Sequence, residues 1–497
     1  MNRFSPGRFL TALAIILCFS SPSAGMRLEE KVGEHTFSNG LQLLTLERHD
    51  VPVLSAYITF GVGSVNEPDH SRGVAHLLEH MLFKGTKTLG TRDYQKEKPL
   101  LEKIEAVGSR LDELKVRSDP DPRELARLRE ELAELQKKHK ELVVKDEFSR
   151  IYAGNGGVGY NAFTSKDMTT YVISLPSNKL ELWAAIESDR MQNAVLREFY
   201  TEREVVREER RRSYETNPGG MLYENLIATA FTVHPYRNPV IGWDSDIVNL
   251  TLKETRDFLH RYYAPANTVI ALVGDIDTEA AVAMVEHYFG NIPPGTPVPP
   301  VVTEEPPQRG EKRERISFEA EPQLAIAYHK PTLPERDDYV FDVIDNLLSA
   351  GRTSRLYRSL VIEQQLAVSV TTYGAPGSRY PNLFVVAATP RYPHTVEEVE
   401  QAIEVELRKL AREPASAAEL EKARNRLATD QLRQLKSNSG LARTLTYYQT
   451  VAGDWRYLVD YNERIATVSA EEVMDVASRY FVPDNRTVVT IGREGGE

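Results

Sequence analysis

The sequence predicts an α+β protein built from two similar sheet-plus-helix sandwich domains, with a helical hairpin inserted in the first. Three observations predict this fold class: a repeated motif, a proline-rich segment between its two copies, and a charged helical stretch within the first half. The length of 497 residues also favours several units, because single domains seldom exceed about 250 residues.

The repeat is the clearest organisational feature. Residues 260–269 are HRYYAPANTV and residues 478–488 are SRYFVPDNRTV, and each copy leads into a run of strand-forming residues. Thr251 and Ser469 precede the copies at similar places, where each is a plausible N-cap of a helix. The two copies therefore predict two helix–turn–strand units from an internal duplication. The alternative is a chance similarity between two such units.

A proline-rich segment separates the two halves. Residues 292–307, IPPGTPVPPVVTEEPP, contain too many prolines for a helix or a central strand. They predict an extended, semi-rigid linker. We therefore expect a first domain at residues 27–291 and a second domain at residues 308–497.

The first half contains an insert at about residues 92–148. Residues 100–115 and 123–145 are predicted to form two charged helices, joined by a segment with two prolines. Leucines recur in the second helix at a spacing of three and four, which places His139 in the seam between the helices rather than at a metal. We expect an antiparallel hairpin that stands off the domain. It is equally compatible with a self-packed arm and with an arm that docks a partner.

Residues 1–25 resemble a secretory signal peptide. Arg3 and Arg8 supply the positive charge, Phe9–Phe19 is an apolar run too short to span a bilayer easily, and small residues follow up to Ala24. We expect cleavage near Ala24 or Gly25, export, and a periplasmic location if the source is a Gram-negative bacterium. The alternative is an uncleaved membrane anchor.

Charge and cysteine content exclude several classes of protein. The formal net charge is -11 and no basic face offsets it, so nucleic acid is not an expected partner. Cys18 is the only cysteine and lies in the signal segment, so we expect no disulfide in the mature chain. The large Leu17 before it argues against lipid attachment there. After the signal segment, no stretch is long and apolar enough to span a membrane.

Residues 76–80, HLLEH, are the candidate catalytic motif. Apolar neighbours and the absence of proline predict a helix, on which His76 and His80 lie one turn apart on one face and can bind one metal ion. Glu79 lies beside them and can reach a water on that metal without binding the metal itself. In such a zinc site the metal lowers the pKa of the water to about 7 and a carboxylate takes its proton. The spacing is that of the inverted zincin motif.

A third metal ligand is expected from residues 202–209, EREVVREE, an acidic stretch predicted to be helical. Glu202 and Glu209 are two turns apart and therefore share one face of such a helix. Glu208 competes with Glu209, because spacing alone cannot separate neighbouring positions. The alternative is a solvent-exposed helix with alternating charges.

Together these segments resemble the pitrilysin, insulysin and mitochondrial processing peptidase family. The resemblance rests on GVAHLLEHMLFKGT, on NAFTSKDMTTY at residues 161–171 and on ER-x-x-V-x-x-E, and it extends over nearly the whole mature chain. It implies two duplicated α+β halves and one zinc ion per chain, held by His76, His80 and Glu209. It also implies that Glu202 is an acidic residue behind the ligands. The long gap between His80 and Glu209 is explained by the predicted hairpin.

The same resemblance implies a substrate-binding edge strand at Asn161, Ala162, Phe163 and Thr164. Independently, this phenylalanine and the threonines that follow are good strand formers, and several glycines precede them as a flexible approach. A strand edge beside the metal would bind an extended peptide through main-chain hydrogen bonds. The alternative is an ordinary sheet strand.

The second half has no HxxEH motif and departs from the family at two positions. Its segment SAGRTSRLYRSLVIEQQLAVSV resembles the family's SRLF-x-x-L-R-E-x-x-G-L-x-Y region, whose arginine and tyrosine help to hold substrate. Val361 and Val368 stand at those two positions, and Arg355 and Tyr357 match other family positions. The departure favours a heterodimer with a related chain that has no zinc site but keeps the arginine and tyrosine. A weakly active homodimer is the alternative.

We therefore expect an exported zinc endopeptidase that hydrolyses unfolded or extended peptides. Glu79 is expected to activate the water and later to protonate the leaving amine. The alternatives are a non-catalytic peptide-binding module and a scaffold subunit of a peptidase-like complex. The enzyme is favoured because the motif glutamate and all three candidate ligands are present.

Overall fold

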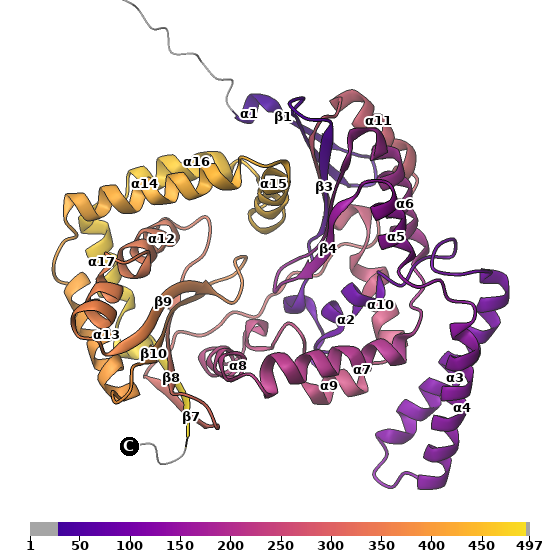
Figure 1. The fold of residues 1–497 in the computed structure, drawn as a ribbon, viewed down its shortest axis with the longest axis horizontal. Coiled ribbons are helices and arrows are strands. Elements are labelled where there is room, and N and C mark those ends of the chain that lie inside the picture. Colours follow the sequence, from indigo (N-terminus) through magenta and orange to yellow (C-terminus); the bar gives the residue numbers. More distant parts are fainter. Residues whose placement is uncertain (1–27, 494–497) are drawn as a thin grey trace, which may run out of the picture.

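The computed structural model describes residues 28–493, so the predicted signal peptide, with Cys18 and the cleavage site, lies outside the described residues. Figure 1 shows two bodies of sheet and helices, the first coloured indigo to pink and the second orange to yellow. A helical hairpin projects from the first body. The predicted fold class is therefore confirmed: α+β, with two similar halves and a hairpin insert.

The first half contains a six-stranded sheet in the order β1-β2-β6-β3-β5-β4. Its strands are β1 Val32–Thr36, β2 Gln42–Glu47, β3 Val53–Phe60, β4 Val158–Thr164, β5 Thr169–Pro176 and β6 Thr268–Gly274. The β2–β6 pair is parallel and the other pairs are antiparallel. Strand β4 forms one edge of the sheet, so one side of its main chain has no neighbouring strand in the described chain.

The second half repeats this arrangement in a five-stranded sheet, ordered β7-β11-β8-β10-β9. Its strands are β7 Lys312–Ser317, β8 Gln323–Lys330, β9 Ala367–Ala375, β10 Asn382–Pro390 and β11 Arg486–Gly492. Again one pair, β7–β11, is parallel and the rest are antiparallel. The order and the place of the parallel pair match those of β2-β6-β3-β5-β4, which is the signature of a duplication.

The repeated motifs form the same unit twice. Helix α10 (Leu252–Tyr262) leads through a 3₁₀ turn into β6, and helix α17 (Ala470–Tyr480) leads through a 3₁₀ turn into β11. Thr251 and Ser469 are N-caps, as predicted, and each forms a reciprocal capping box with the glutamate three residues on.

Helices pack on both sheets. In the first half the others are α1 Leu28–Lys31, α2 Val74–Met81, α3 Tyr94–Lys115, α4 Pro122–Lys140, α5 Glu147–Gly154, α6 Leu180–Asn193, α7 Phe199–Arg210, α8 Pro218–Ala230, α9 Asp244–Asn249 and α11 Thr278–Phe289. In the second half they are α12 Arg336–Ser349, α13 Val396–Leu410, α14 Ala417–Gln434, α15 Asn438–Ala452 and α16 Tyr457–Ala466. Among residues 28–493, no helix combines the length and the apolar character needed to cross a bilayer.

The two halves are interlocked by an exchange of helices. One face of each sheet is covered by helices of its own half, such as α2 and α6 on the first sheet and α12 and α13 on the second. The other face of the first sheet packs against α15 of the second half, through Leu441 and Leu445. The other face of the second sheet packs against α8 of the first half, through Leu222 and Leu226. Each buried leucine contributes roughly 1.5–3 kcal/mol, so the halves stabilise one another.

The segment between α11 and β7 contains no helix or strand. The carboxylate of Glu305 within it accepts hydrogen bonds from the backbone N–H groups of Thr232, Val233 and His234, at 2.7–3.0 Å. These bonds fix the extended segment to the chain that follows α8.

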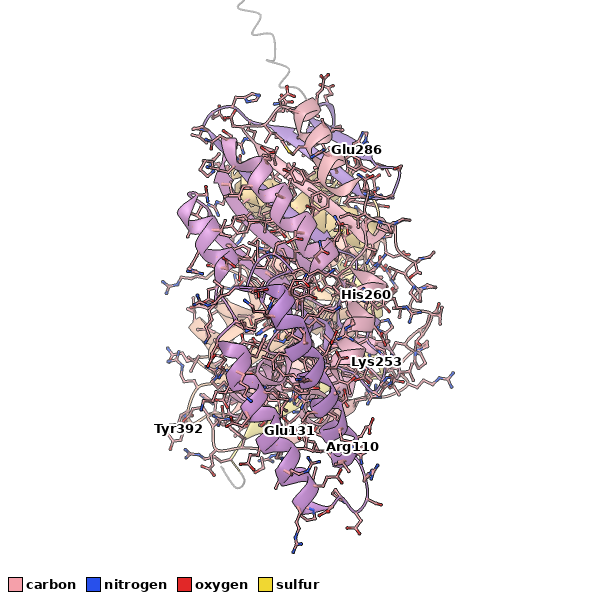
Figure 2. All side chains as sticks on the ribbon, turned by 90° about the vertical axis from the view of Figure 1, so that its right-hand side faces the viewer. Arg110, Glu131, Lys253, His260, Glu286 and Tyr392 are labelled. Atoms are coloured by element: carbon pink, nitrogen blue, oxygen red, sulfur yellow. The ribbon has the colours of Figure 1, made fainter. Side chains whose placement is uncertain are left out.

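The hairpin of α3 and α4 differs from the prediction at its ends. Helix α3 begins at Tyr94 rather than near residue 100, because Asp93 caps it by accepting a bond from the N–H of Lys96 and because Pro99 lies early enough to cost only one helical hydrogen bond. Helix α4 ends at Lys140 rather than 145. Figure 2 looks onto the hairpin, with Arg110 of α3 and Glu131 of α4 labelled.

A buried ion-pair network fixes the base of the hairpin. His139 is 2% exposed, and its Nε2 lies 2.8 Å from Oε1 of Glu97 on α3. Arg197, which is fully buried just before α7, donates to the same carboxylate at 2.7 and 3.0 Å. The network connects both hairpin helices to the body of the first half.

Candidate metal centre

Helix α2 presents the two histidines of the HLLEH motif. It packs between β4 and α7 (Figure 1). Its N-terminus follows Gly73, whose φ of 96° is in the left-handed region that favours glycine. The carboxylate of Glu67 accepts hydrogen bonds from the N–H groups of Gly73 and Ala75, both at 2.9 Å. These bonds satisfy donors that the first helical turn leaves free, and so fix where α2 begins.

His76, His80 and Glu209 come together in space. The two imidazole rings are 4.8 Å apart between centroids. Oε1 of Glu209 lies 3.7 Å from Nε2 of His76, and Oε2 lies 3.5 Å from Nε2 of His80. One ligand atom from each residue lies within 4.8 Å of the others, and no second cluster of this kind occurs among residues 28–493.

Glu209, not Glu208, faces the histidines. Successive helical residues point about 100° apart, so on α7 only one of the two can face α2. The exposed Glu208 instead accepts two bonds from the guanidinium of Arg211, at 2.7 and 2.9 Å. The side chain of Glu209 is 38% exposed, which leaves room beside the cluster for water and substrate.

Glu202 lies behind His80. Its Oε1 is 3.0 Å from Nδ1 of His80, and its Oε2 is 2.5 Å from Nζ of Lys84. Burial alone would raise the pKa of Glu202, but the bonds from His80 and Lys84 outweigh it and lower the pKa to about 2. An ionised carboxylate only accepts, so Nδ1 of His80 donates, and in the neutral imidazole Nε2 then keeps its lone pair on the side of Glu209.

His76 is held in its neutral form. Burial, and then the nearby His80, lower its pKa to about 3. Its Nδ1 is buried and has no hydrogen-bond partner among the described residues, so only Nε2 has a polar group in front of it. A neutral imidazole is the form that binds a metal ion.

Glu79 on α2 lies next to the cluster of His76, His80 and Glu209 and contacts the end of the edge strand β4. It is 8% exposed, and its Oε2 accepts a hydrogen bond from Oγ1 of Thr164 at 2.5 Å. Burial raises its pKa, against the opposing effects of Thr164 and His80. A carboxylate with a raised pKa beside a candidate metal site is suited to take up a proton and return it.

The four predicted substrate-binding residues lie on β4. Asn161 is exposed and lines a cavity of about 540 Å³ together with Glu79. Ala162 is buried, so only its main chain can contact a peptide. Phe163 is half-buried, with the guanidinium of Arg443 from α15 at 5.6 Å from its ring. Thr164 reaches Glu79, as described above.

Sequence reasoning missed three contributions to this centre. Glu67 caps the histidine helix, Lys84 holds Glu202, and Thr164 bonds to Glu79 rather than serving only as strand. Lys84 follows His80 by four residues but lies beyond the end of α2 at Met81, so its place close after the motif was the only signal that sequence reasoning could have used. No local pattern indicated the other two bonds, which join segments brought together only by the fold.

In the second half, Val361 lies shortly before the edge strand β9, and Val368 lies on that strand. Val361 is partly buried in the helical turn Tyr357–Glu363 against the core, and Val368 on β9 is 56% exposed. Arg355 forms a two-bond ion pair with Glu419, at 2.8 and 3.0 Å. Its guanidinium is therefore engaged, and it does not replace the arginine absent at position 361.

The donor set fits zinc. Two imidazole nitrogens with free lone pairs and one carboxylate, with an adjacent side open to solvent, are the ligands of a catalytic zinc site. The carboxylate behind His80 is the supporting partner that such histidines have. The fold and this cluster define a class of protein: a duplicated two-domain chain with one candidate metal centre in its first half.

Comparisons with known proteins identify the family. Residues 43–119 and 145–244 match the family described as Insulinase (Peptidase family M16), and residues 249–427 match the Peptidase M16 inactive domain. The gap between the first two matched segments contains the whole of α4. The chain belongs to the M16 peptidase family, and the match to the peptidase model lies within its first half.

Several relatives are named proteases. The chain is 27% identical to Zinc protease PqqE of Helicobacter pylori, over 98% of this chain and 99% of that protein. It is 23% identical to Probable mitochondrial-processing peptidase subunit beta of Arabidopsis thaliana, over 92% and 77% of the two chains. Relatives of this family are thus named zinc proteases, and the His76, His80 and Glu209 cluster is a possible site for that metal.

Solved structures share the fold. The crystal structure of a protease from Helicobacter pylori superposes with a TM-score of 0.78 at 26% identity, covering 93% of this chain and 99% of that one. The periplasmic protease PqqL from Escherichia coli superposes with a TM-score of 0.68 at 17% identity, covering 93% and 47%.

Proposed function

We propose that the chain is a zinc-dependent endopeptidase that hydrolyses peptide bonds of unfolded or extended peptides. The observation that supports this most is the convergence of two imidazoles and Glu209 beside the buried Glu79, at the end of an edge strand. One zinc ion per chain would be held by Nε2 of His76, Nε2 of His80 and the carboxylate of Glu209. Bound there, zinc would polarise the scissile carbonyl and lower the pKa of a water molecule.

Glu79 is proposed as the general base and then the general acid. Its Oε2 is engaged by Thr164, so Oε1 is the atom available to take a proton from water and to give it to the leaving amine. Burial favours the protonated form of this carboxyl, which keeps the proton available for the second step. Glu202 acts through His80, by holding Nδ1 so that Nε2 faces the metal position.

The edge strand β4 is proposed to bind the substrate backbone. One edge of Asn161 to Thr164 pairs with β5, and the other has no strand beside it in the described chain. An extended peptide could add to that edge through main-chain hydrogen bonds. A peptide bound in this way would run past Thr164 to Glu79. The site would then select for an extended shape more than for side-chain identity.

The chain is proposed to be the zinc-bearing subunit of a heterodimer. Valine at 361 and at 368 provides neither a guanidinium nor a phenol, and Arg355 is engaged by Glu419. A related chain without HxxEH but with the arginine and tyrosine would supply both. One relative is named a mitochondrial-processing peptidase subunit, which supports the interpretation that this chain also works in a complex of several subunits. A weakly active homodimer is the alternative.

The proposed location is outside the cytoplasm, and in the periplasm if the source is a Gram-negative bacterium. The support is the signal-like sequence of residues 1–25 and the periplasmic location named for one structural relative. N-terminal sequencing of the native protein tests it. A mature terminus near Ala24 is expected, and a terminus at Met1 would contradict it.

A quenched mixed-peptide assay tests the proposed activity. The purified chain, with and without a candidate partner, is measured before and after chelation and after zinc is restored. Cleavage that chelation abolishes and zinc restores is expected. Tight peptide binding without cleavage under every condition would favour the alternative, a non-catalytic peptide-binding or scaffold subunit.

A further inference from the structure

A second polar cavity, of about 350 Å³, lies in the second half between α12, β9 and α15. Asp338, Asp342 and Asp345 line it from one face of α12, because they are spaced four and three residues apart. Tyr447 and Tyr448 of α15 line it from another side. Nothing in the proposed chemistry at α2 uses this cavity.

Its aspartates are only partly engaged. Oδ2 of Asp342 accepts a hydrogen bond from the hydroxyl of Tyr461 at 2.8 Å, and Oδ1 of Asp345 accepts one from Thr372. Among the described residues, no hydrogen bond uses the other oxygen of either carboxylate. Burial raises the pKa of Asp342 to about 7 and that of Asp345 to about 6, so both carboxyls are partly protonated near neutral pH, and a cation bound beside them would favour their ionised form.

Asn382 adds an independent acceptor. The residue is 4% exposed and lines the cavity, and its Nδ2 donates to the carbonyl of Gly377. That carbonyl can only accept, so the remaining atom is the amide oxygen, and it has no hydrogen-bond partner among residues 28–493. A buried acceptor without a donor costs about 1–3 kcal/mol, so a ligand with N–H donors would relieve it.

The cavity already accommodates one ammonium group. Nζ of Lys330 pairs with Asp338 and lies 5.5 Å from the centroid of the Phe341 ring. The same combination of carboxylate and aromatic ring would suit a second cation. A metal ion is disfavoured, because the three aspartates cannot each bring an oxygen within 4.8 Å of the others, as His76, His80 and Glu209 do.

The cavity lies next to the proposed peptide-binding strand. Ser378 lines it, and the N–H of Ser378 donates at 2.8 Å to Asp167, which belongs to the turn directly after β4. On α15, Tyr447 lies one helical turn, roughly 6 Å, beyond Arg443, whose guanidinium contacts Phe163 of β4. A peptide on β4 gains about 3.3 Å per residue, so a side chain a few positions past Thr164 would reach the cavity.

We propose that this cavity is a subsite for one basic side chain, arginine or lysine, of the peptide bound on β4. Asp342, Asp345 and the amide oxygen of Asn382 would accept the N–H groups, and Tyr447 and Tyr448 would flank the alkyl stem. This rests on the proposed function, because it takes β4 as the strand that binds substrate.

The test uses peptides that differ in charge at one position. Neutral ten-residue peptides, acetylated and amidated so that the termini add no charge, receive a single arginine or its uncharged analogue citrulline at each position in turn. The zinc-loaded enzyme should cleave the arginine peptide with a kcat/KM about tenfold or more above its citrulline twin at one position. A ratio near one at every position would overturn the proposal.

A double variant, Asp342→Asn with Asp345→Asn, should bring that ratio close to one. The matched control is Asp337→Asn, which removes a charge from the same helix outside the cavity and should keep the ratio. An unchanged ratio in the double variant would show that the preference for arginine comes from residues other than these two aspartates. Thermal unfolding shows whether the variant folds, and the arginine–citrulline comparison in the unaltered chain stands without it.

Binding separates this proposal from the proposed activity. Fluorescein-labelled arginine and citrulline peptides are titrated with the unaltered chain and followed by anisotropy. If no peptide is cleaved but the arginine peptide binds about tenfold more tightly, the subsite stands and the peptidase proposal fails. If peptides are cleaved but neither rate nor binding depends on the arginine, the subsite fails alone.

Discussion

Nδ1 of His80 lies 3.0 Å from the carboxylate of Glu202, whose other oxygen is bonded to Lys84. This one contact determines which nitrogen of His80 has its lone pair toward Glu209. It also explains why two glutamates seven residues apart on α7 have different roles. Glu209 faces both histidines, whereas Glu202 orients one of them.

Glu202→Gln should weaken zinc binding by about 10- to 100-fold, because supporting partners of metal-binding histidines contribute on this order. Zinc affinity is measured by competition with a chromogenic chelator. The matched control is Glu204→Gln on the exposed side of the same helix, which should leave affinity unchanged. Equal affinities for Glu202→Gln and the unaltered chain would remove Glu202 from the centre.

His76→Ala, His80→Ala and Glu209→Gln should each reduce bound zinc from about one ion per chain to a small fraction, because each removes one of three protein ligands. Metal content is measured by atomic emission after dialysis. Glu208→Gln is the neighbouring control and should keep its zinc, since that side chain pairs with Arg211. Loss of zinc from Glu208→Gln, with zinc retained by Glu209→Gln, would instead identify Glu208 as the third ligand.

Arg197→Met should destabilise the fold by about 3–5 kcal/mol, because it leaves the buried Glu97 without its guanidinium partner. Urea unfolding measures the change. Arg127→Met, which breaks an exposed pair with Glu131 on α4, is the control and should have no measurable effect. A small loss for Arg197→Met would mean that the hairpin base contributes little to stability.

Val361→Arg together with Val368→Tyr should raise the turnover of the lone chain, by on the order of 10²-fold if the pair stabilises the transition state. The exposed Val368 leaves space for a tyrosine. Val368→Phe supplies the ring without the hydroxyl and is the control. Full turnover by the unaltered lone chain, unchanged by any partner, would contradict the heterodimer proposal.

The parts of the fold that local pattern determines were predictable. The spacing of His76 and His80 is a property of any helix, and the capped repeats at Thr251 and Ser469 specify the same unit twice. Contacts between distant segments were not predictable. Nothing in the sequence of α8 or α15 indicates that each packs on the sheet of the other half.

Within the candidate site, too, local patterns were predictable and contacts between distant segments were not. Adjacent glutamates at 208 and 209 cannot be ranked by spacing, because the choice depends on how α7 is rotated against α2. Helix α3 begins at Tyr94 rather than near residue 100, because Asp93 caps it. The bond from Thr164 to Glu79 joins β4 to α2 and required the fold to be known.

Glu79→Gln tests the central claim most directly. The amide keeps the shape of the side chain but cannot take a proton, so the variant should bind about one zinc ion per chain and cleave the mixed peptides at least about 10²-fold more slowly. Zinc content and initial rates are measured on the same preparation, with Glu208→Gln as the surface control. Retention of zinc with loss of cleavage is the predicted result. Cleavage at the unaltered rate by zinc-loaded Glu79→Gln would contradict the account.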